Sequence, residues 1–174
     1  HLCERRQRQM CIRDSDCVYL DAGTSTGWMI EYIRETQATY VTNALSHAKR
    51  LADKGFHVIL IGGEPKSSTD AIVGAEAVVN LQKYHFSKGF FGTNGVEQNG
   101  GFTTPDAREA MVKQTAVKNT QLANRYFLAT SSKFGEVYAV TFAGFEGGVI
   151  LTEASVQESL PKSVRVVNVN QPEQ

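Results

Sequence analysis

Short apolar runs alternate with amphipathic segments along most of the chain. The apolar runs predict strands at residues 17–20, 39–42, 57–61, 88–92, 125–129, 148–152 and 164–169. Helical spacing lies between them at residues 26–35, 44–54, 74–83 and 106–122, and a short helix is expected between the last two strands. Strands that are apolar at nearly every position and alternate with helices are typical of a buried parallel sheet. The pattern predicts one α/β domain, with an open, mainly parallel sheet and helices on both faces.

Polar loops follow five of these strands. They cover residues 21–26, 42–44, 62–69, 92–95 and 130–133, and they are rich in Gly, Ser, Thr and Asn. Helix caps and turns would explain any one of them. In an open parallel sheet, however, ligands bind beyond the carboxyl ends of the strands, where all five loops gather. Because Asp21, Glu64 and Lys133 accompany these loops, we expect a polar ligand site at this edge.

The first loop, "DAGTST" at residues 21–26, suits an oxyanion. It leads into a predicted helix, whose first N–H groups are unpaired, and Gly23 allows a close approach of the backbone. It lacks the lysine of a Walker loop and the G-x-G-x-x-G pattern of a dinucleotide site. Other polar side chains that suit sugar hydroxyls are Asp21, Asn43, Glu64, Asn94 and Asp106. This mixture favours a phosphorylated sugar over a bare anion.

A second informative stretch is "GGFTTPDAREAMVKQ" at residues 100–114. Here Thr104 is expected to cap a helix that has Pro105 in its first position. Asp106, Glu109 and Lys113 then share one helix face. Glu109 and Lys113 form either a surface pair worth ~0.2–0.5 kcal/mol or part of the ligand site, with Lys113 near the charge of the ligand. The spacing alone leaves both interpretations open.

Composition describes an ordinary globular chain of 174 residues, 41% hydrophobic and 21% charged, with a formal net charge of zero. No apolar run is long enough to span a membrane, and no signal-peptide core is present. The four histidines (residues 1, 47, 57 and 85) lack metal-site spacing, and no G-x-S-x-G motif occurs. We therefore expect no catalytic residue, no metal and no cofactor.

The first fifteen residues depart from the rest of the chain. Residues 5–14 follow the order in which a transposase-type sequencing adaptor is translated. We interpret residues 1–15 as a non-native tail that packs on nothing, and residues 16–174 as the authentic domain. The alternative is a basic arm that binds nucleic acid. Of 18 basic and 18 acidic residues the tail holds four and two, which leaves 14 and 16, a net charge of −2. Cys17 is then the only cysteine, so no disulfide framework is expected.

Taken together, the loops resemble the C-terminal sensor domain of DeoR-family bacterial transcription regulators. The resemblance runs from about residue 17 to about residue 153, and rests on Glu109, Lys113 and the stretches "LDAGTST", "YVTNA", "VILIGGE", "AIVGAEA", "FFGTNGV", "GGFTTPD" and "SSKFG". It implies a fold shared with ribose-5-phosphate isomerase and the CoA transferases. It also implies an upstream winged helix-turn-helix that binds the DNA operator, a sugar-phosphate effector that relieves repression, and a cytoplasmic protein that is a homo-oligomer at full length.

The resemblance assigns ligand contacts to a set of loop residues: Asp21, Gly23, Thr24, Ser25, Thr26, Thr42, Asn43, Gly62, Gly63, Glu64, Gly92, Thr93, Asn94, Gly95, Thr103, Thr104, Asp106, Glu109, Lys113, Ser131, Ser132 and Lys133. Thr130 stands where the family often has Asp, which weakens a carboxylate role in that loop. The forms "FFGTNGV" and "GGFTTPD" look most like regulators of fructose operons, whose effector is fructose 1-phosphate.

Two other functions stay open at this stage. One is a sugar-phosphate isomerase of the same fold, in which Asp21, Glu64, Asp106 or Glu109 abstracts a proton. The other is a purely structural oligomerisation domain, which the polar loops disfavour.

Overall fold

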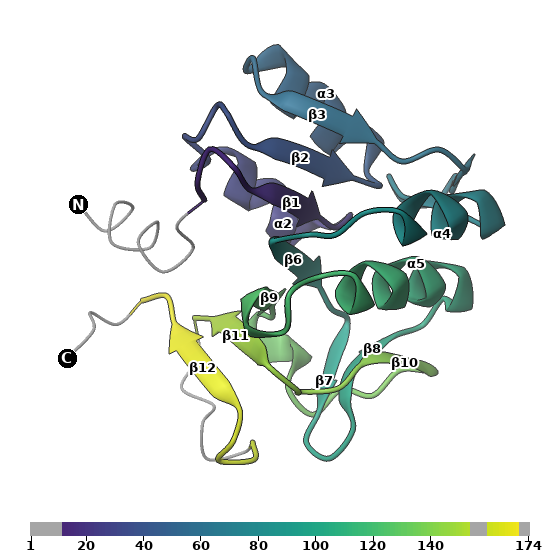
Figure 1. Cartoon of the computed structure of the whole chain (residues 1–174). Coiled ribbons are helices and arrows are strands. Elements are labelled where there is room, and N and C mark those ends of the chain that lie inside the picture. Colours follow the sequence, from purple (N-terminus) through teal and green to yellow (C-terminus); the bar gives the residue numbers. More distant parts are fainter. Residues whose placement is uncertain (1–11, 154–159, 171–174) are drawn as a thin grey trace.

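Seven parallel strands form the central sheet of the computed structural model, which describes residues 12–153 and 160–170 (Figure 1). In chain order they are β1 (Cys17–Leu20), β2 (Thr39–Thr42), β3 (His57–Leu60), β6 (Lys88–Gly92), β9 (Arg125–Leu128), β11 (Gly148–Thr152) and β12 (Arg165–Asn168). Their order across the sheet is β12-β11-β9-β6-β1-β2-β3. The predicted parallel α/β fold is confirmed.

The strand order reverses at β1. The chain moves outward from β1 to β2 and β3, then returns to pair β6 with the other edge of β1. Leu20 at the end of β1 lies opposite Thr42 of β2 and Phe90 of β6. The loops that follow these three strands therefore meet at one point, and such a reversal is where open α/β sheets bind ligands.

Among the described residues, four α-helices cover the two faces of the sheet, as predicted. Helices α2 (Thr24–Ile30) and α3 (Leu45–Asp53) pack on the face that holds Val18 and Leu20. Helices α4 (Ala75–Gln82) and α5 (Ala107–Lys118) pack on the face that holds Tyr19. Successive residues of β1 point to opposite faces, so a single strand contributes to both cores.

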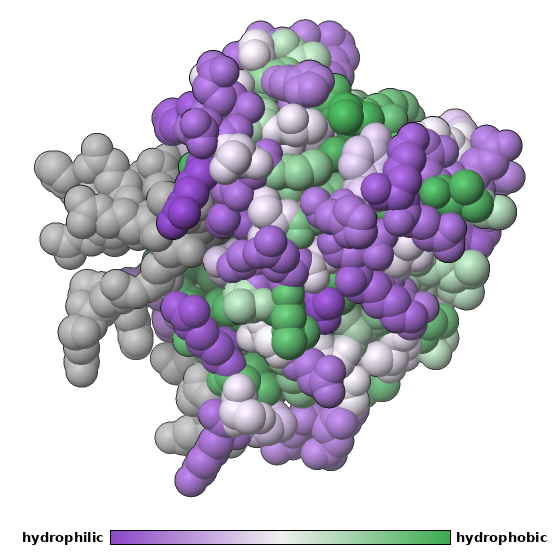
Figure 2. All heavy atoms as spheres, in the orientation of Figure 1, coloured by the Kyte–Doolittle hydropathy of each residue, from purple (hydrophilic) through white to green (hydrophobic). Residues whose placement is uncertain are grey.

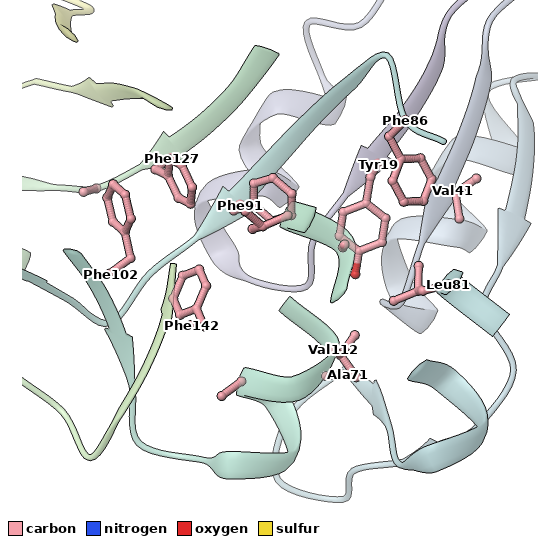
Figure 3. Close-up of a cluster of buried hydrophobic side chains, with 14 of the residues drawn as sticks. Tyr19, Val41, Ala71, Leu81, Phe86, Phe91, Phe102, Val112, Phe127 and Phe142 are labelled. Atoms are coloured by element: carbon pink, nitrogen blue, oxygen red, sulfur yellow. The ribbon is translucent and has the colours of Figure 1, made fainter. Parts of the chain in front are cut away.

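Aromatic side chains form much of the core on the α4–α5 face, as Figure 3 shows. Tyr19 and Phe91 lie with ring centroids 5.6 Å apart, and Phe91 and Phe127 lie 5.5 Å apart. Phe102 stacks on Phe127 at 3.8 Å. This row of rings joins the central sheet to a small antiparallel sheet of order β10-β8-β7.

The small sheet corrects the sequence prediction. Its strands are β7 (Gly95–Glu97), β8 (Gly101–Thr104) and β10 (Val140–Ala143), where no strand was predicted. A further hairpin joins β4 (Glu64–Pro65), inside the expected loop at residues 62–69, to β5 (Ile72–Val73), and short 3-10 helices η1 (Leu122–Asn124) and η2 (Ser131–Lys133) flank β9. Glycine and threonine weaken the apolar pattern in β7 and β8, and β10 pairs with β8, a strand distant from it in sequence.

Helix boundaries also differ from the prediction. The first helix ends at Ile30, not at residue 35, and the last begins after Asp106. The side chain of Asp106 caps α5 by accepting hydrogen bonds from the backbone N–H groups of Arg108 and Glu109. Thr104 belongs to β8, so the expected Thr104 cap is wrong. A short helix was expected between the last two strands, and residues 154–159 of that segment lie outside the described residues.

One contact bears on the proposed N-terminal tail. Ile12 is partly buried against the core that includes Val18 and Leu20, and the backbone N–H of Arg13 donates to Asp16 at 2.7 Å. The expectation that residues 1–15 pack on nothing is therefore wrong at Ile12. Met10 lies outside the described residues, and the non-native origin of the tail stays a prediction.

The surface seen in Figure 2 is mostly polar, and its apolar side chains form separate small patches. Among the described residues, none of the helices combines the length and the apolar character of a membrane span.

Candidate functional site

A cavity of about 790 Å³ opens at the carboxyl ends of β1, β2 and β6, at the point where the strand order reverses. It is lined by Asp21, Ala22, Gly23, Thr24, Ser25, Gly27, Trp28, Glu31, Asn43, Ser46, His47, Arg50, Thr69, Asp70, Ala71, Gly92, Thr93, Asn94, Glu109, Lys113 and Lys133. These residues come from six separate segments of the chain. The sequence had predicted a site at this edge.

The floor of the cavity holds a buried ion pair between Asp21 and Lys113. The ammonium group of Lys113 contacts Oδ2 of Asp21 and also donates to the backbone carbonyl of Gly92 at 3.1 Å. The backbone N–H of Gly92 donates to the same Asp21 oxygen at 3.1 Å. Lys113 further lies over the ring of Phe142, 5.4 Å from its centroid. The pair fixes α5 against the ends of β1 and β6.

The Asp21 carboxylate is incompletely satisfied. Its side chain is almost wholly buried, and Oδ1 has no hydrogen-bond partner. Burial raises the pKa of Asp21, while Lys113 and the N–H of Gly92 partly offset that rise. A buried acceptor without a donor costs about 1–3 kcal/mol. The floor therefore favours an incoming hydrogen-bond donor such as a sugar hydroxyl.

The loop between β1 and α2 has the conformation that the sequence suggested. Gly23 has φ of 145°, a value that L side chains rarely adopt, and no side chain caps the first turn of α2. Thr24 and Ser25 line the cavity. Thr26 instead points inward, where its hydroxyl donates to the backbone carbonyl of Asp21 at 2.5 Å. Thr26 thus holds the loop from the side of the core, while Thr24 and Ser25 lie at the cavity.

Asn43 lines the cavity, but its amide is occupied by the protein. Its Oδ1 accepts from the hydroxyl of Tyr19 and from the backbone N–H of Ala22, each at 3.0 Å. Its Nδ2 donates to the carbonyl of Ile72 at 3.1 Å. Asn43 therefore positions the 22–26 loop against β5.

Half of the residues expected at the site lie in the cavity and half lie outside it. Those inside are Asp21, Gly23, Thr24, Ser25, Asn43, Gly92, Thr93, Asn94, Glu109, Lys113 and Lys133. Those that do not line it are Thr26, Thr42, Gly62, Gly63, Glu64, Gly95, Thr103, Thr104, Asp106, Ser131 and Ser132.

Several of the outside residues have structural partners. Glu64 pairs with Arg108, and Asp106 pairs with Lys66 at 2.9 Å besides capping α5. The alternative that Glu109 pairs with Lys113 on the surface is wrong. Glu109 instead accepts from Lys66 at 3.3 Å and from Thr69 at 3.0 Å.

The sequence analysis missed the wall between α2 and α3. This wall contains His47 and Arg50 of α3 and, on the opposing α2 side, Trp28 and Glu31. His47 is 5% exposed, and its Nε2 lies 3.1 Å from the hydroxyl of Thr26. The one local signal was that His47 falls in the first turn after a polar loop. Among the described residues, no group of three or more His, Cys, Asp or Glu side chains is placed to hold a metal ion.

Comparison with known sequences identifies the relatives of the chain. The family described as "DeoR C terminal sensor domain" matches residues 7–152. The "Uncharacterized HTH-type transcriptional regulator FruR" of Bacillus subtilis is 44% identical over 142 residues, which cover 81% of this chain and 56% of that protein. A "Lactose phosphotransferase system repressor" of Staphylococcus aureus is 34% identical over 134 residues, 75% of this chain and 52% of that protein.

Comparison with solved structures supports the fold alone. A ribose 5-phosphate isomerase from Plasmodium falciparum aligns with a TM-score of 0.51 at 8% identity, over 76% of this chain and 50% of that one. The chain spans about half the length of the curated relatives it matches. The family match begins at residue 7, within the expected tail, so the domain boundary at residue 16 stays a prediction.

Proposed function

Because the chain belongs to the family of DeoR C-terminal sensor domains, we propose that it is the effector-sensing domain of a bacterial repressor of sugar catabolism. Its cavity binds a phosphorylated sugar, which relieves repression. The observation behind this proposal is that one cavity brings together three features. They are the loop at residues 23–25, which no side chain caps, the ammonium group of Lys133, and the buried ion pair between Asp21 and Lys113.

The cavity offers different chemistry to the two parts of such a ligand. The N–H groups and hydroxyls of Thr24 and Ser25, with the ammonium of Lys133, suit a phosphate, because charge-assisted hydrogen bonds are the stronger ones. The orphaned oxygen of Asp21 and the neighbouring Asn94 suit sugar hydroxyls. The phosphate thus supplies most of the affinity and the hydroxyls supply selectivity.

Fructose 1-phosphate is the best candidate for the effector. The stretches "FFGTNGV" and "GGFTTPD" resemble regulators of fructose operons. In the same proposal the full-length protein is a cytoplasmic homo-oligomer that contacts its operator through an upstream winged helix-turn-helix. The authentic part of this chain, with a net charge of −2, does not bind DNA specifically by itself.

Calorimetry tests the proposal with three ligands. Fructose 1-phosphate is expected to bind at least about tenfold more tightly than fructose, since each hydrogen bond to a charged group is worth roughly 1.5–3 kcal/mol. Inorganic phosphate tests the anion alone. Trp28 is the sole tryptophan and lines the cavity, so its fluorescence gives a second readout. Equal affinity for fructose and fructose 1-phosphate would contradict the proposal.

Two variants locate the site and one controls for charge. Thr24→Ala and Lys133→Ala weaken fructose 1-phosphate binding and leave folding nearly intact, because both side chains lie at the cavity rim. Lys118→Ala removes an exposed lysine from α5 outside the cavity and is expected to bind as the wild type does. Product analysis of the same mixtures addresses the isomerase alternative, for which no conversion of ribose 5-phosphate or fructose 1-phosphate is expected.

A further inference from the structure

His47 is the buried titratable group of the cavity that the proposed function has not used. It lies in the first turn of α3, on the wall that faces α2. Its side chain is 5% exposed, and its Nδ1 is a buried nitrogen with no hydrogen-bond partner. Within the part of the chain that the structure describes, no donor or acceptor satisfies this nitrogen.

The hydrogen bonds around Thr26 determine which ring nitrogen carries the proton. The Thr26 hydroxyl has one hydrogen. Its oxygen lies 2.5 Å from the backbone carbonyl of Asp21 and 3.0 Å from that of Gly23, so the hydroxyl donates this hydrogen to a carbonyl. Its 3.1 Å contact with His47 then requires that Nε2–H of the histidine donates to the hydroxyl oxygen. Burial lowers the pKa of His47, so the ring is neutral near neutral pH. A neutral ring with its proton on Nε2 leaves Nδ1 as a bare acceptor.

The His47 ring and Arg50 pack closely against Gly27 of α2. A Cβ on Gly27 would lie 3.1 Å from Cε1 of His47 and 3.3 Å from Nη1 of Arg50, closer than ordinary van der Waals contact, so the glycine allows both side chains to approach α2. Arg50 is itself held by Glu31 at 2.7 Å, in a pair that is partly exposed to solvent. Because Nδ1 is itself buried, contact with a ligand group requires a neighbouring side chain, such as the partly exposed Arg50, to move.

We propose that His47 is a specificity-determining residue that accepts a hydrogen bond, through Nδ1, from a hydroxyl group of the sugar part of the effector. This inference rests on the proposed function, and it identifies the wall between α2 and α3 as the part of the cavity that recognises the sugar. A second phosphate is disfavoured at this place, because phosphate oxygens and a bare ring nitrogen are both acceptors. The cavity therefore takes a monophosphate, with its anion near Lys133 and a hydroxyl at His47.

A pair of substitutions separates recognition from structure. In His47→Gln the amide nitrogen replaces Nε2 and keeps the contact with Thr26, but no acceptor replaces Nδ1. In His47→Asn the amide oxygen replaces Nδ1, but the contact with Thr26 is lost. Calorimetry with fructose 1-phosphate is expected to show affinity about three- to tenfold weaker for His47→Gln, the effect of one neutral hydrogen bond. His47→Asn is expected to retain affinity within about twofold.

Inorganic phosphate provides the matched ligand, because it carries the anion without the sugar. All three proteins are expected to bind it with the same affinity. Nitrogen NMR of the wild type should show the Nδ1 resonance moving when fructose 1-phosphate is added. The inference is overturned if His47→Gln binds fructose 1-phosphate as tightly as the wild type. It is also overturned if the affinity of this variant for inorganic phosphate falls by the same factor as its affinity for fructose 1-phosphate. The third contradicting outcome is an Nδ1 resonance that does not move. A wild type that binds no sugar phosphate overturns the proposed function itself.

Discussion

At the scale of single residues, the ion pair between Asp21 and Lys113 dominates the site. The two residues are 1% and 7% exposed. Removing one member of a buried pair leaves an uncompensated charge, which is far more costly than the net value of the pair. Lys113 therefore affects stability as well as binding.

We predict that Lys113→Met destabilises the domain by about 3–5 kcal/mol at neutral pH in urea unfolding. The loss should shrink in acid, because Asp21 then becomes protonated and the buried charge disappears. The control Lys118→Met, exposed on the same helix, should stay within about ±0.5 kcal/mol. A loss below about 1 kcal/mol for Lys113→Met would show that the pair does not hold α5 in place.

His47 gives a pH-dependent contribution to stability. Its pKa in the folded protein lies below the ordinary value of 6.5, because burial disfavours the charged ring. As the pH falls, His47 therefore binds a proton in the unfolded chain before it does so in the folded protein. The free energy of unfolding decreases from about pH 6.5 down to the folded pKa, by at most ~1.4 kcal/mol per pH unit. We predict that the stability of the wild type relative to His47→Gln decreases between pH 7.5 and pH 5 in urea unfolding. Parallel curves would contradict this.

At the scale of elements, two helices have caps that the sequence analysis did not identify. Asp106 caps α5, where Thr104 was expected. Asp70 lies in the loop before β5 and accepts from the backbone N–H of Ser46 at 2.8 Å, in the first turn of α3. The second cap spans 24 residues in sequence. Asp106 could have been recognised from its local sequence, whereas the contribution of Asp70 depends on the tertiary structure.

We predict that Asp70→Ala lowers the free energy of unfolding by about 0.5–2 kcal/mol, the usual value of a helix cap. The same substitution displaces the wall next to His47, so fructose 1-phosphate affinity should fall with it. Asp53→Ala is the matched control, because its carboxylate sits in the last turn of α3 in an exposed pair with Lys49. That pair contributes ~0.3–0.5 kcal/mol. Equal effects of the two substitutions in urea unfolding would refute the cap.

At the scale of the whole molecule, the cavity is lined by residues from both halves of the sheet. One side comes from β1, β2 and the helices that follow them, and the other from β6, α5 and the loop after β9. A ligand held between them opposes separation of the two halves. Binding at this site is therefore coupled to global unfolding.

We predict that fructose 1-phosphate raises the melting temperature of the domain. At a concentration of 100 times Kd the stabilisation is about 2.7 kcal/mol, which corresponds to roughly 5–11 °C for a domain of this size. Calorimetric scans at increasing concentration should follow this relation, and fructose at the same concentration should shift the melting temperature far less. An equal rise in melting temperature with fructose would indicate that binding does not depend on the phosphate group.

The sequence by itself determined the class of fold and the edge at which the site lies. Apolar strands that alternate with helices dictate a parallel sheet, and polar loops after those strands must then share one edge. The contacts inside the cavity were decided only by the tertiary structure. Asp21 and Lys113 pair across 92 residues, and Thr26 meets His47 across 21. Local periodicity reports which face of an element is buried, but a partner distant in sequence depends on how elements are arranged around the reversal at β1.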